Sequence, residues 1–279
     1  MNIKNFLLGS HSFFDYLWDT GTPGSGFTIF GSTHLIVLGI LTLIIASMCI
    51  FYKKQNNHTQ HRIIQIIALV IFLLEIIKQI TFPLLHSQYY ISEIPLHLCA
   101  ITIYLEIIYV FFPKTTTTIG EILYSLSLPG ALTALIFPCW TMYPLNNFYC
   151  LHSFFVHTLH IAFILMLIIS RHLHPKVTNL WRVVVFLIII IPPIYLLNIH
   201  LKTNFFYVNA GSEGSPLELF INIFGNPGFL LPYIGSVLIV WLLMYLPWLI
   251  IDHKKGKNNE QTKIFTSIYQ CEKQEETCC

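Results

Sequence analysis

Charged side chains are scarce in this chain: Asp, Glu, Lys and Arg make up 10% of its 279 residues. Soluble globular domains carry about a quarter charged residues, so this composition excludes an ordinary soluble fold, and the apolar runs exclude a disordered or collagen-like chain. The formal net charge is only +2, which excludes a nucleic-acid-binding protein that works through bulk electrostatic attraction. We therefore expect no nucleic acid among its partners.

Several motifs of metal and redox chemistry are also missing. The seven cysteines include no CxxC pair, which argues against a zinc scaffold or a thioredoxin-type redox site. No HExxH motif occurs, and although His157 and His160 are three residues apart, the sequence supplies no carboxylate to complete a site with them. We expect neither a bound metal nor a cofactor.

Long apolar runs dominate the sequence instead. A helix needs about 20 apolar residues to cross the hydrocarbon core of a bilayer, because unpaired backbone groups cannot face lipid. The runs are rich in Ile and Leu without alternating polar residues, which argues against a β-barrel. The sequence predicts an all-α, polytopic membrane helix bundle with seven transmembrane helices, at residues 33–52, 63–81, 94–112, 118–138, 148–170, 183–199 and 229–250.

The basic residues are distributed unevenly between the two sides of this predicted bundle. Twelve lie in the first, third and fifth loops and the C-terminal tail, whereas only Lys4 and Lys202 lie on the opposite side. Because basic loops resist translocation, this bias predicts an external N-terminus and a cytoplasmic C-terminus in a multi-pass protein of the cell membrane. Its partners are then membrane lipids, and its oligomeric state is left open.

Three parts follow from this topology. Residues 1–32 form an external N-terminal segment, which lacks the basic start and apolar core of a cleaved signal peptide. Residues 33–251 form the seven-helix bundle. Residues 252–279 form a polar cytoplasmic tail, which we expect to be mobile.

Ionisable side chains inside the spans indicate where function resides, because such groups are costly in lipid and usually face the bundle interior. Four of them are acidic or basic: Glu75, Lys78, Glu106 and Glu121. Glu75 and Lys78 are three residues apart on one helix and can neutralise each other, which favours a structural role. Glu121 lies near the cytoplasmic end of its span, where we expect it to reach water.

A second set of polar residues shares one depth in the outer half of the membrane. At about 1.5 Å rise per residue, Cys99 lies about 8 Å inside its span and His157 about 14 Å, a difference that helix tilt closes. Four spans contribute to this polar layer, whose members are His34, His97, Cys99, His152, His157, Asn198, Asn204 and Tyr207.

Cys99 is the candidate nucleophile of the polar layer. Buried cysteine commonly behaves as a small hydrophobe, which is the interpretation we favour for Cys49. A thiol becomes a good nucleophile when a neighbouring base takes its proton, and histidine is the usual base near neutral pH. Three histidine-bearing helices converge at the depth of Cys99. The residues alone leave open catalysis, ligand binding without chemistry, and a purely structural role.

Five short motifs, in order along the chain, resemble those of the YwaF-type integral membrane proteins. They are FGSTHL at 30–35, PLHLC at 95–99, PGALTAL at 129–135, HSFFVH at 152–157 and KTNFFY at 202–207. That family takes in a vertebrate protein regarded as an ether-phospholipid acyltransferase. The resemblance implies a cysteine nucleophile and a histidine partner, which fall on Cys99 and His157. Two positions depart from the pattern: Cys139 stands where an aspartate is frequent, and Lys202 replaces a glycine.

The sequence therefore predicts a membrane-embedded lipid acyltransferase. His157 takes the proton of Cys99, and the thiolate forms a thioester before the acyl group moves to a lipid hydroxyl. The alternative is a non-enzymatic carrier or sensor that binds a small polar or lipid ligand. We expect the other members of the polar layer to bind the substrate: His34, His97, His152, Asn198, Asn204 and Tyr207.

Three features of the loops and span ends complete the predictions. Cys139 and Cys150 flank an external loop and are placed to form a disulfide in an oxidising exterior. Residues 217–224 are too few to cross the membrane, and we expect them to lie on the outer surface as an amphipathic lid over the polar layer. Tryptophans near span ends are expected to anchor the membrane interface: Trp140, Trp241 and Trp248.

Overall fold

The computed structural model of the chain describes residues 13–14, 26–85, 91–112, 115–211 and 214–276. Within these ranges every regular element is a helix. Seven of the described helices are long and apolar enough to cross a membrane, which confirms the predicted all-α fold with seven spans. Most of the predicted N-terminal segment 1–32, and the last three residues of the predicted tail, lie outside the described residues.

The seven spans follow one another as in the prediction. The fourth is built from three consecutive pieces, the middle one being a π-helical turn, η3. The helices of the spans are α2 (Ser32–Lys53), α3 (Asn57–Leu85), α4 (Leu98–Phe111), α5 (Thr116–Ile122) with η3 (Leu123–Ser127) and α6 (Leu128–Ile136), α7 (Phe148–Ile169), α8 (Leu180–Leu201) and α10 (Leu230–Glu276). The third and sixth spans begin before α4 and α8, at Ile91 and Val177, and the seventh is the part of α10 up to Lys254. The other elements are α9 (Pro216–Phe224) and three short turns, η1 (Ile91–Glu93), η4 (Val177–Asn179) and η5 (Phe205–Tyr207).

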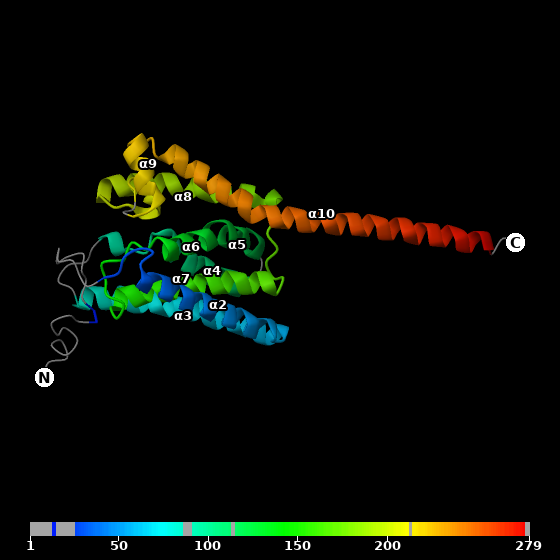
Figure 1. Cartoon of the computed structure of the whole chain (residues 1–279), viewed down its shortest axis with the longest axis horizontal. Helices are drawn as coiled ribbons and strands as arrows, with labels where there is room; N and C mark the ends of the chain where they lie inside the picture. Colours follow the sequence, from blue (N-terminus) through cyan, green and yellow to red (C-terminus); the bar gives the residue numbers. More distant parts are fainter. Residues whose placement is uncertain (1–12, 15–25, 86–90, 113–114, 212–213, 277–279) are drawn as a thin grey trace.

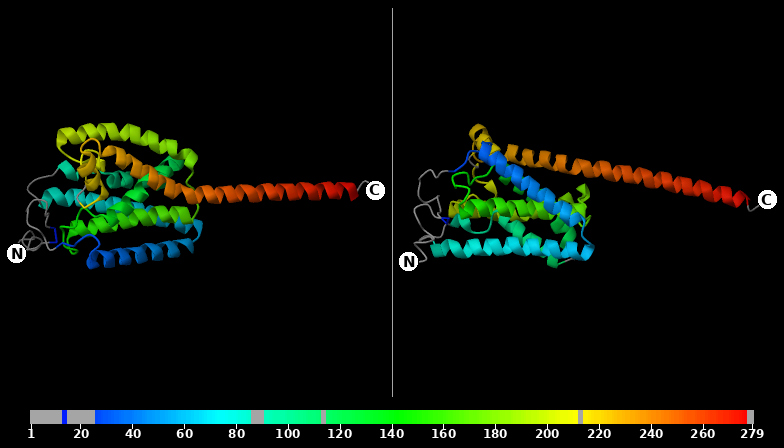
Figure 2. Two further views of the ribbon diagram at one scale, coloured as in Figure 1. Left: turned by 45° about the horizontal axis from the view of Figure 1, so that its top comes forward. Right: turned by 60° about the horizontal axis from the view of Figure 1, so that its bottom comes forward.

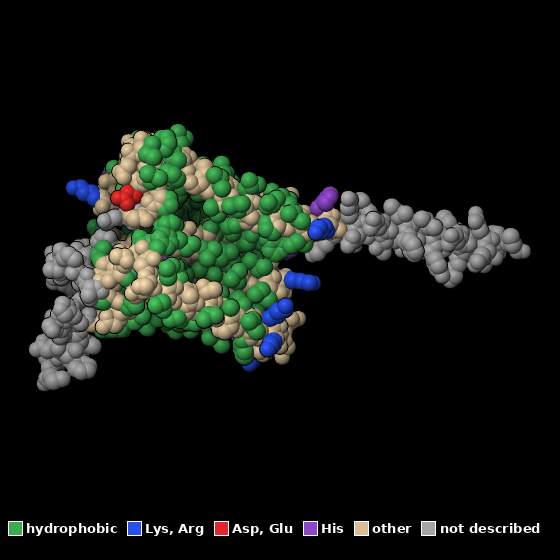
Figure 3. Space-filling model, viewed as in Figure 1, with side chains coloured by type: hydrophobic (Ala, Val, Ile, Leu, Met, Phe, Trp, Pro, Cys, Tyr) green, Lys and Arg blue, Asp and Glu red, His purple; other side chains and the backbone are tan. Residues whose placement is uncertain are grey.

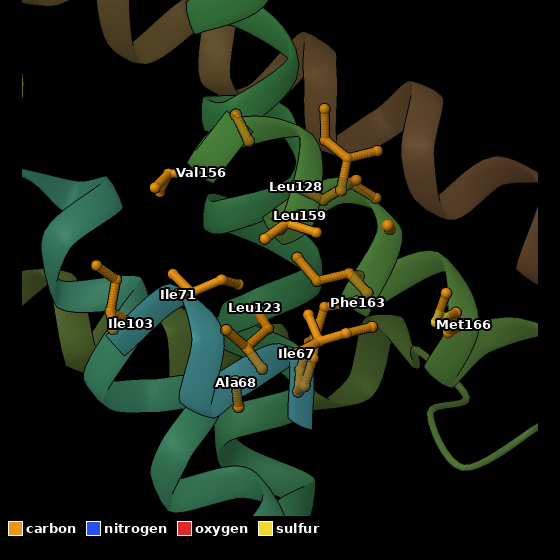
Figure 4. Packing of buried hydrophobic residues seen from close by; sticks show 14 of the residues in the cluster. Ile67, Ala68, Ile71, Ile103, Leu123, Leu128, Val156, Leu159, Phe163 and Met166 are labelled. Atoms are coloured by element: carbon orange, nitrogen blue, oxygen red, sulfur yellow. The ribbon is translucent and has the colours of Figure 1, made fainter. Parts of the chain in front are cut away.

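Helix α7 lies at the centre of the bundle. It packs against α2, α3 and α6, and most of its side chains are buried. Figure 4 shows part of the core that results, which includes Ile71 of α3, Ile103 of α4, Leu123 of η3, and Leu159 and Phe163 of α7. This core fixes α4 against α7, the two helices that carry Cys99 and His157.

Helices α8, α9 and α10 form a second layer beside the central bundle (Figure 1). One set of buried contacts attaches this layer to the central bundle through α10, and a second packs Phe205 and Ile194 against the start of α4. The indole Nε1 of Trp241 donates to the carbonyl oxygen of Ser125 at 2.9 Å, and the hydroxyls of Ser125 and Tyr245 are 2.7 Å apart. The hydroxyl of Tyr124 donates to the carbonyl oxygen of Met244 at 2.7 Å. The two layers enclose a cavity between them.

Glu121 belongs to the attachment through α10, and the expectation that it reaches water is wrong. Its side chain is 1% exposed. One carboxylate oxygen accepts from the backbone N–H of Lys176 at 2.9 Å and from Nδ2 of Asn179 at 3.1 Å, and the other accepts from the hydroxyl of Tyr245 at 2.7 Å. The carboxylate is therefore satisfied inside the protein, where it joins α5 to the chain before α8 and to α10.

Several helix ends differ from the prediction: α3 begins six residues earlier and ends four residues later than predicted, and two other differences affect the site and the tail. Helix α4 begins at Leu98, four residues after the start of the apolar run, because Pro95 disfavours helical geometry in the residue before it and His97 is extended (φ −65°, ψ 152°). Cys99 thus lies in the first turn of α4, although the candidate span that contains α4 begins earlier, at Ile91. Helix α10 continues to Glu276 and projects from the bundle (Figures 1 and 2), so the tail that we expected to be mobile is helical there. The sequence there is rich in Lys, Gln and Glu, which favour helix.

Basic side chains gather at the end of the bundle from which α10 projects (Figure 3). The other end shows a single patch of Lys or Arg on this face and an acidic patch. The predicted orientation, with the C-terminus in the cytoplasm, depends on this gathering of basic side chains at one end. The orientation itself stays a prediction.

Candidate active site

A cavity of about 2060 Å³ lies between the second layer and the central bundle. Helices α4, α6 and α7 supply one wall, and α8, η5, α9 and α10 supply the other. Figure 3 shows a recess in this face of the molecule, within a surface of apolar side chains. The cavity is larger than the 300–1,000 Å³ or so of most small-molecule pockets, so it has room for a ligand with long apolar chains.

Cys99 and His157 meet on the wall of this cavity. The sulfur of Cys99 is 3.1 Å from Nε2 of His157, and Nδ1 of the same ring is 2.6 Å from the carbonyl oxygen of Ser153. Because a carbonyl oxygen only accepts hydrogen bonds, the neutral ring carries its proton on Nδ1 and directs a lone pair from Nε2 at the thiol. This is the tautomer that a general base for Cys99 requires.

Trp140 holds the imidazole of His157 from another side. The two rings are nearly parallel, with centroids 5.3 Å apart and an interplanar angle of 21°. Trp140 is 7% exposed and lines the cavity, so its prediction as an interface anchor is wrong. Trp241 is buried as well and also lines the cavity. Indole stacking and the Ser153 carbonyl together fix the plane and the tautomer of His157.

Two further predicted residues, His97 and Tyr207, lie side by side on the cavity wall. The ring of His97 packs 5.0 Å from that of Phe205 and 5.9 Å from that of Tyr207, centroid to centroid. The hydroxyl of Tyr207 donates to the sulfur of Cys139 at 3.6 Å. Asn204, which also lines the cavity, uses its side-chain oxygen to accept from the backbone of its own loop.

His152 and a group of charges occupy another part of the cavity wall. Nε2 of His152 is 3.8 Å from a carboxylate oxygen of Glu75, too far for a hydrogen bond. Nζ of Lys78 lies 3.9 Å from Glu75 and 3.1 Å from Glu93, which confirms the expected pairing on α3 and extends it to η1. These charges are largely neutralised among themselves.

Asn198 does not line the cavity, although we expected it to bind substrate. It is buried, and it holds the loop that follows α8: Nδ2 donates to the carbonyl of Phe205 at 3.0 Å and to Oδ1 of Asn209 at 2.7 Å, while Oδ1 accepts from the N–H of Phe205 at 2.9 Å. In that loop Lys202, which replaces a glycine of the resembling family, has φ 54° and ψ 38°. The Asn198 bonds help to keep this left-handed residue in place.

His34 is also absent from the cavity wall. Its fully buried ring accepts at Nδ1 from the N–H of Phe30 at 3.0 Å and donates from Nε2 to the carbonyl oxygen of Leu135 at 2.9 Å. It therefore connects the start of α2 to the end of α6. These bonds give His34 a structural role, and its expected part in substrate binding stays a prediction.

Replacing His34 by Ala is accordingly expected to lower the free energy of unfolding by about 1–3 kcal/mol, because the buried carbonyl of Leu135 loses its donor. Unfolding in mixed detergent micelles measures this change. The alkylation rate of Cys99 in the folded variant should equal that of the parent. If the variant instead kept the parental free energy of unfolding but its Cys99 were alkylated more slowly, His34 would belong to the site.

Cys139 is a second thiol on the cavity wall. Burial raises the pKa of this thiol above its ordinary value, and the hydrogen bond from Tyr207 opposes the shift only in part. The thiol is therefore neutral near pH 7, and its hydrogen-bond partner is a phenol and not an imidazole. Cys139 and Cys150 are both free, so the disulfide that the sequence allowed is not formed.

A buried acid–imidazole pair escaped the sequence analysis. Nδ1 of His160 is 2.9 Å from a carboxylate oxygen of Glu106, and both side chains are fully or almost fully buried. The spacing of these residues is a signal for the pair: Glu106 follows Cys99 by seven residues, and His160 follows His157 by three. Cys99 and Glu106 share one face of α4, and His157 and His160 share one face of α7. Helices that bring Cys99 to His157 therefore also bring Glu106 to His160. Among the described residues, no three His, Cys, Asp or Glu side chains are grouped as a metal site.

These features define a seven-helix membrane protein with a thiol–imidazole pair on the wall of a large, mainly apolar cavity. A family model matches residues 29–245, and the chain belongs to the TMEM164 family. No curated protein and no solved structure matches the chain. The matched region contains all five motifs that resemble the YwaF-type proteins, while that name and the acyltransferase link stay predictions.

Proposed function

We propose that this protein is a lipid acyltransferase that forms a thioester on Cys99. The observation that carries the proposal is the 3.1 Å contact between the thiol and Nε2 of His157 in the tautomer of a general base. Membership of the TMEM164 family supports the placement in a membrane. The reaction itself is argued from the chemistry of the pair and from the cavity.

The transfer proceeds in two half-reactions. Nε2 of His157 takes the thiol proton, and the sulfur attacks the carbonyl carbon of an acyl ester in the cavity. The resulting tetrahedral intermediate expels an alkoxide, which receives the proton from Nε2 and leaves as an alcohol. A lipid hydroxyl then attacks the thioester, gives its proton to Nε2, and releases the thiolate of Cys99, which is reprotonated by the imidazolium.

The cavity favours transfer over hydrolysis. Its walls are largely apolar, and its volume of about 2060 Å³ accommodates long acyl chains beside the sulfur. Helix α9 contributes Leu217 and Phe220 to the wall, as expected for the predicted lid. A dry site strengthens polar interactions and keeps water from the thioester, so a hydroxyl held in the cavity is the favoured acceptor.

The test is direct detection of the thioester. The full chain in lipid nanodiscs is incubated with a phospholipid that bears an alkyne-tagged acyl chain, and the tag is located by mass spectrometry. We expect the label on Cys99, released by neutral hydroxylamine, absent from Cys99→Ala, and retained in Cys139→Ala, which removes the other cavity thiol. Bound phospholipid with no covalent label on Cys99 contradicts the proposal and favours a carrier or sensor.

A further inference from the structure

The first turn of α4 presents backbone donors beside Cys99. The N–H groups at the start of an α-helix have no carbonyl oxygen within the helix to bond. The extended residue before α4, His97, makes no side-chain cap bond, and the first main-chain bond of the turn runs from the N–H of Ile101 to the carbonyl of His97 at 3.0 Å. Leu98, Cys99 and Ala100 therefore have no acceptor inside α4, and all three line the cavity.

The indole of Trp140 is an independent second observation near this turn, since its ring stacks on the imidazole that contacts Cys99. Its Nε1 is buried and has no hydrogen-bond partner, although the indole N–H can only donate. The indoles of Trp241 and Trp248 differ, since they donate to the carbonyl of Ser125 and the hydroxyl of Tyr124, each at 2.9 Å. An unsatisfied buried donor on a cavity wall, stacked on the imidazole of the reactive pair, points to an acceptor that the ligand supplies.

We propose that Nε1 of Trp140 and the backbone N–H groups at the start of α4 form an oxyanion site for Cys99. This inference rests on the proposed function and assigns a catalytic residue to it. When the sulfur attacks an acyl carbon, the carbonyl oxygen gains negative charge and lies beside the first turn of α4, to which that sulfur belongs. These groups then donate hydrogen bonds to the oxyanion, and the positive end of the helix dipole faces it.

Another unpartnered nitrogen on the cavity wall does not compete for this role. Nε2 of His152 is buried without a hydrogen bond, but it faces the carboxylate of Glu75 at 3.8 Å. The indole of Trp140 has no such acid opposite it and contacts the ring of His157. Trp140 is therefore the side-chain donor that the geometry assigns to the reacting oxygen.

Two reactions of Cys99 separate the oxyanion site from other roles of the indole. Acylation by the tagged phospholipid builds a negative oxygen, whereas alkylation by an iodoacetamide displaces iodide from a saturated carbon and builds none. Both reactions need the thiol and His157. In Trp140→Phe we expect acylation to slow by about 100-fold, as for loss of one oxyanion donor, with alkylation unchanged.

Trp181→Phe is the matched control, because Trp181 is exposed and does not line the cavity. We expect it to leave both rates near those of the parent. Should Trp140→Phe fold poorly, benzothienylalanine at position 140 keeps the double ring and replaces only the N–H with sulfur. The same selective loss of acylation is expected from it.

Each other outcome overturns the proposal. Equal slowing of acylation and alkylation would show that Trp140 only positions His157 and does not donate to the oxyanion. Unchanged acylation in the benzothienylalanine protein would show that its N–H meets no oxyanion. A parent protein that is alkylated but never acylated at Cys99 would overturn the proposed function, and the oxyanion site with it.

Discussion

Replacing His157 by Gln is expected to slow thioester formation on Cys99 by about 1,000-fold near pH 7, within the range typical for loss of a general base. The parental Nε2 lies 3.1 Å from the sulfur, and the Ser153 carbonyl keeps the ring proton on Nδ1. Gln keeps a polar side chain at this position but cannot take the thiol proton. The initial rate of labelling by the tagged phospholipid, followed in nanodiscs, measures the effect.

The control for this prediction uses another histidine of the same helix. His152 lines the cavity five residues away, and it faces the carboxylate of Glu75, not Cys99. Alkylation of Cys99 by iodoacetamide should fall strongly in His157→Gln and stay at the parental rate in His152→Gln. A His157→Gln protein that forms the thioester within tenfold of the parent would rule out His157 as the base.

The fold could be predicted from the sequence because a bilayer leaves few choices to an apolar chain. Runs of about 20 residues must form helices to satisfy their backbone, so the existence and order of the spans followed from composition. The errors lie where a local or tertiary effect outweighs hydropathy. Pro95 delays the start of α4, and the carboxylate of Glu121 finds partners in η4 and α10 instead of water.

The candidate site could be predicted only in part. Depth along the spans brought Cys99 and His157 together, since depth depends on the position of a residue in its helix. Depth does not predict the direction in which a side chain points, nor the backbone carbonyl to which it hydrogen-bonds. His34 bonds the carbonyl of Leu135, 101 residues away, and Trp140 comes from a loop; neither partner has a signal in one sequence.

The cavity depends on contacts between the two layers that hydropathy does not indicate. The second layer is attached to the central bundle by hydrogen bonds and ring contacts of α10 residues 241–248 with α5 and η3. The π-helical turn at η3 supplies the Ser125 carbonyl that receives Trp241 there. A second contact lies toward the other end, where Phe205 and Ile194 pack against Leu98 and Ile101 of α4, and the cavity wall includes residues of both contacts. The polar side chains that hold the layers together thus also position the walls of the site.

Replacing Glu106 by Leu is expected to lower the free energy of unfolding by about 3 kcal/mol, among the largest single effects in the bundle. The carboxylate is fully buried between α4 and α7 and pairs with Nδ1 of His160 at 2.9 Å. Leu removes one partner and leaves a buried imidazole without its acceptor. Reversible unfolding of the variant in mixed micelles measures the loss.

The double variant Glu106→Leu/His160→Phe distinguishes the effect of the unpaired imidazole from the effect of side-chain packing. Because both polar groups are then gone, we expect it to recover most of the stability lost in Glu106→Leu, as happens when buried ion pairs are replaced by apolar groups of similar size. Its Cys99 should alkylate at the parental rate, since His157 is held by Ser153 and Trp140 and not by His160. A double variant as unstable as Glu106→Leu would mean that the fit of the side chains, and not the unpaired imidazole, sets the loss.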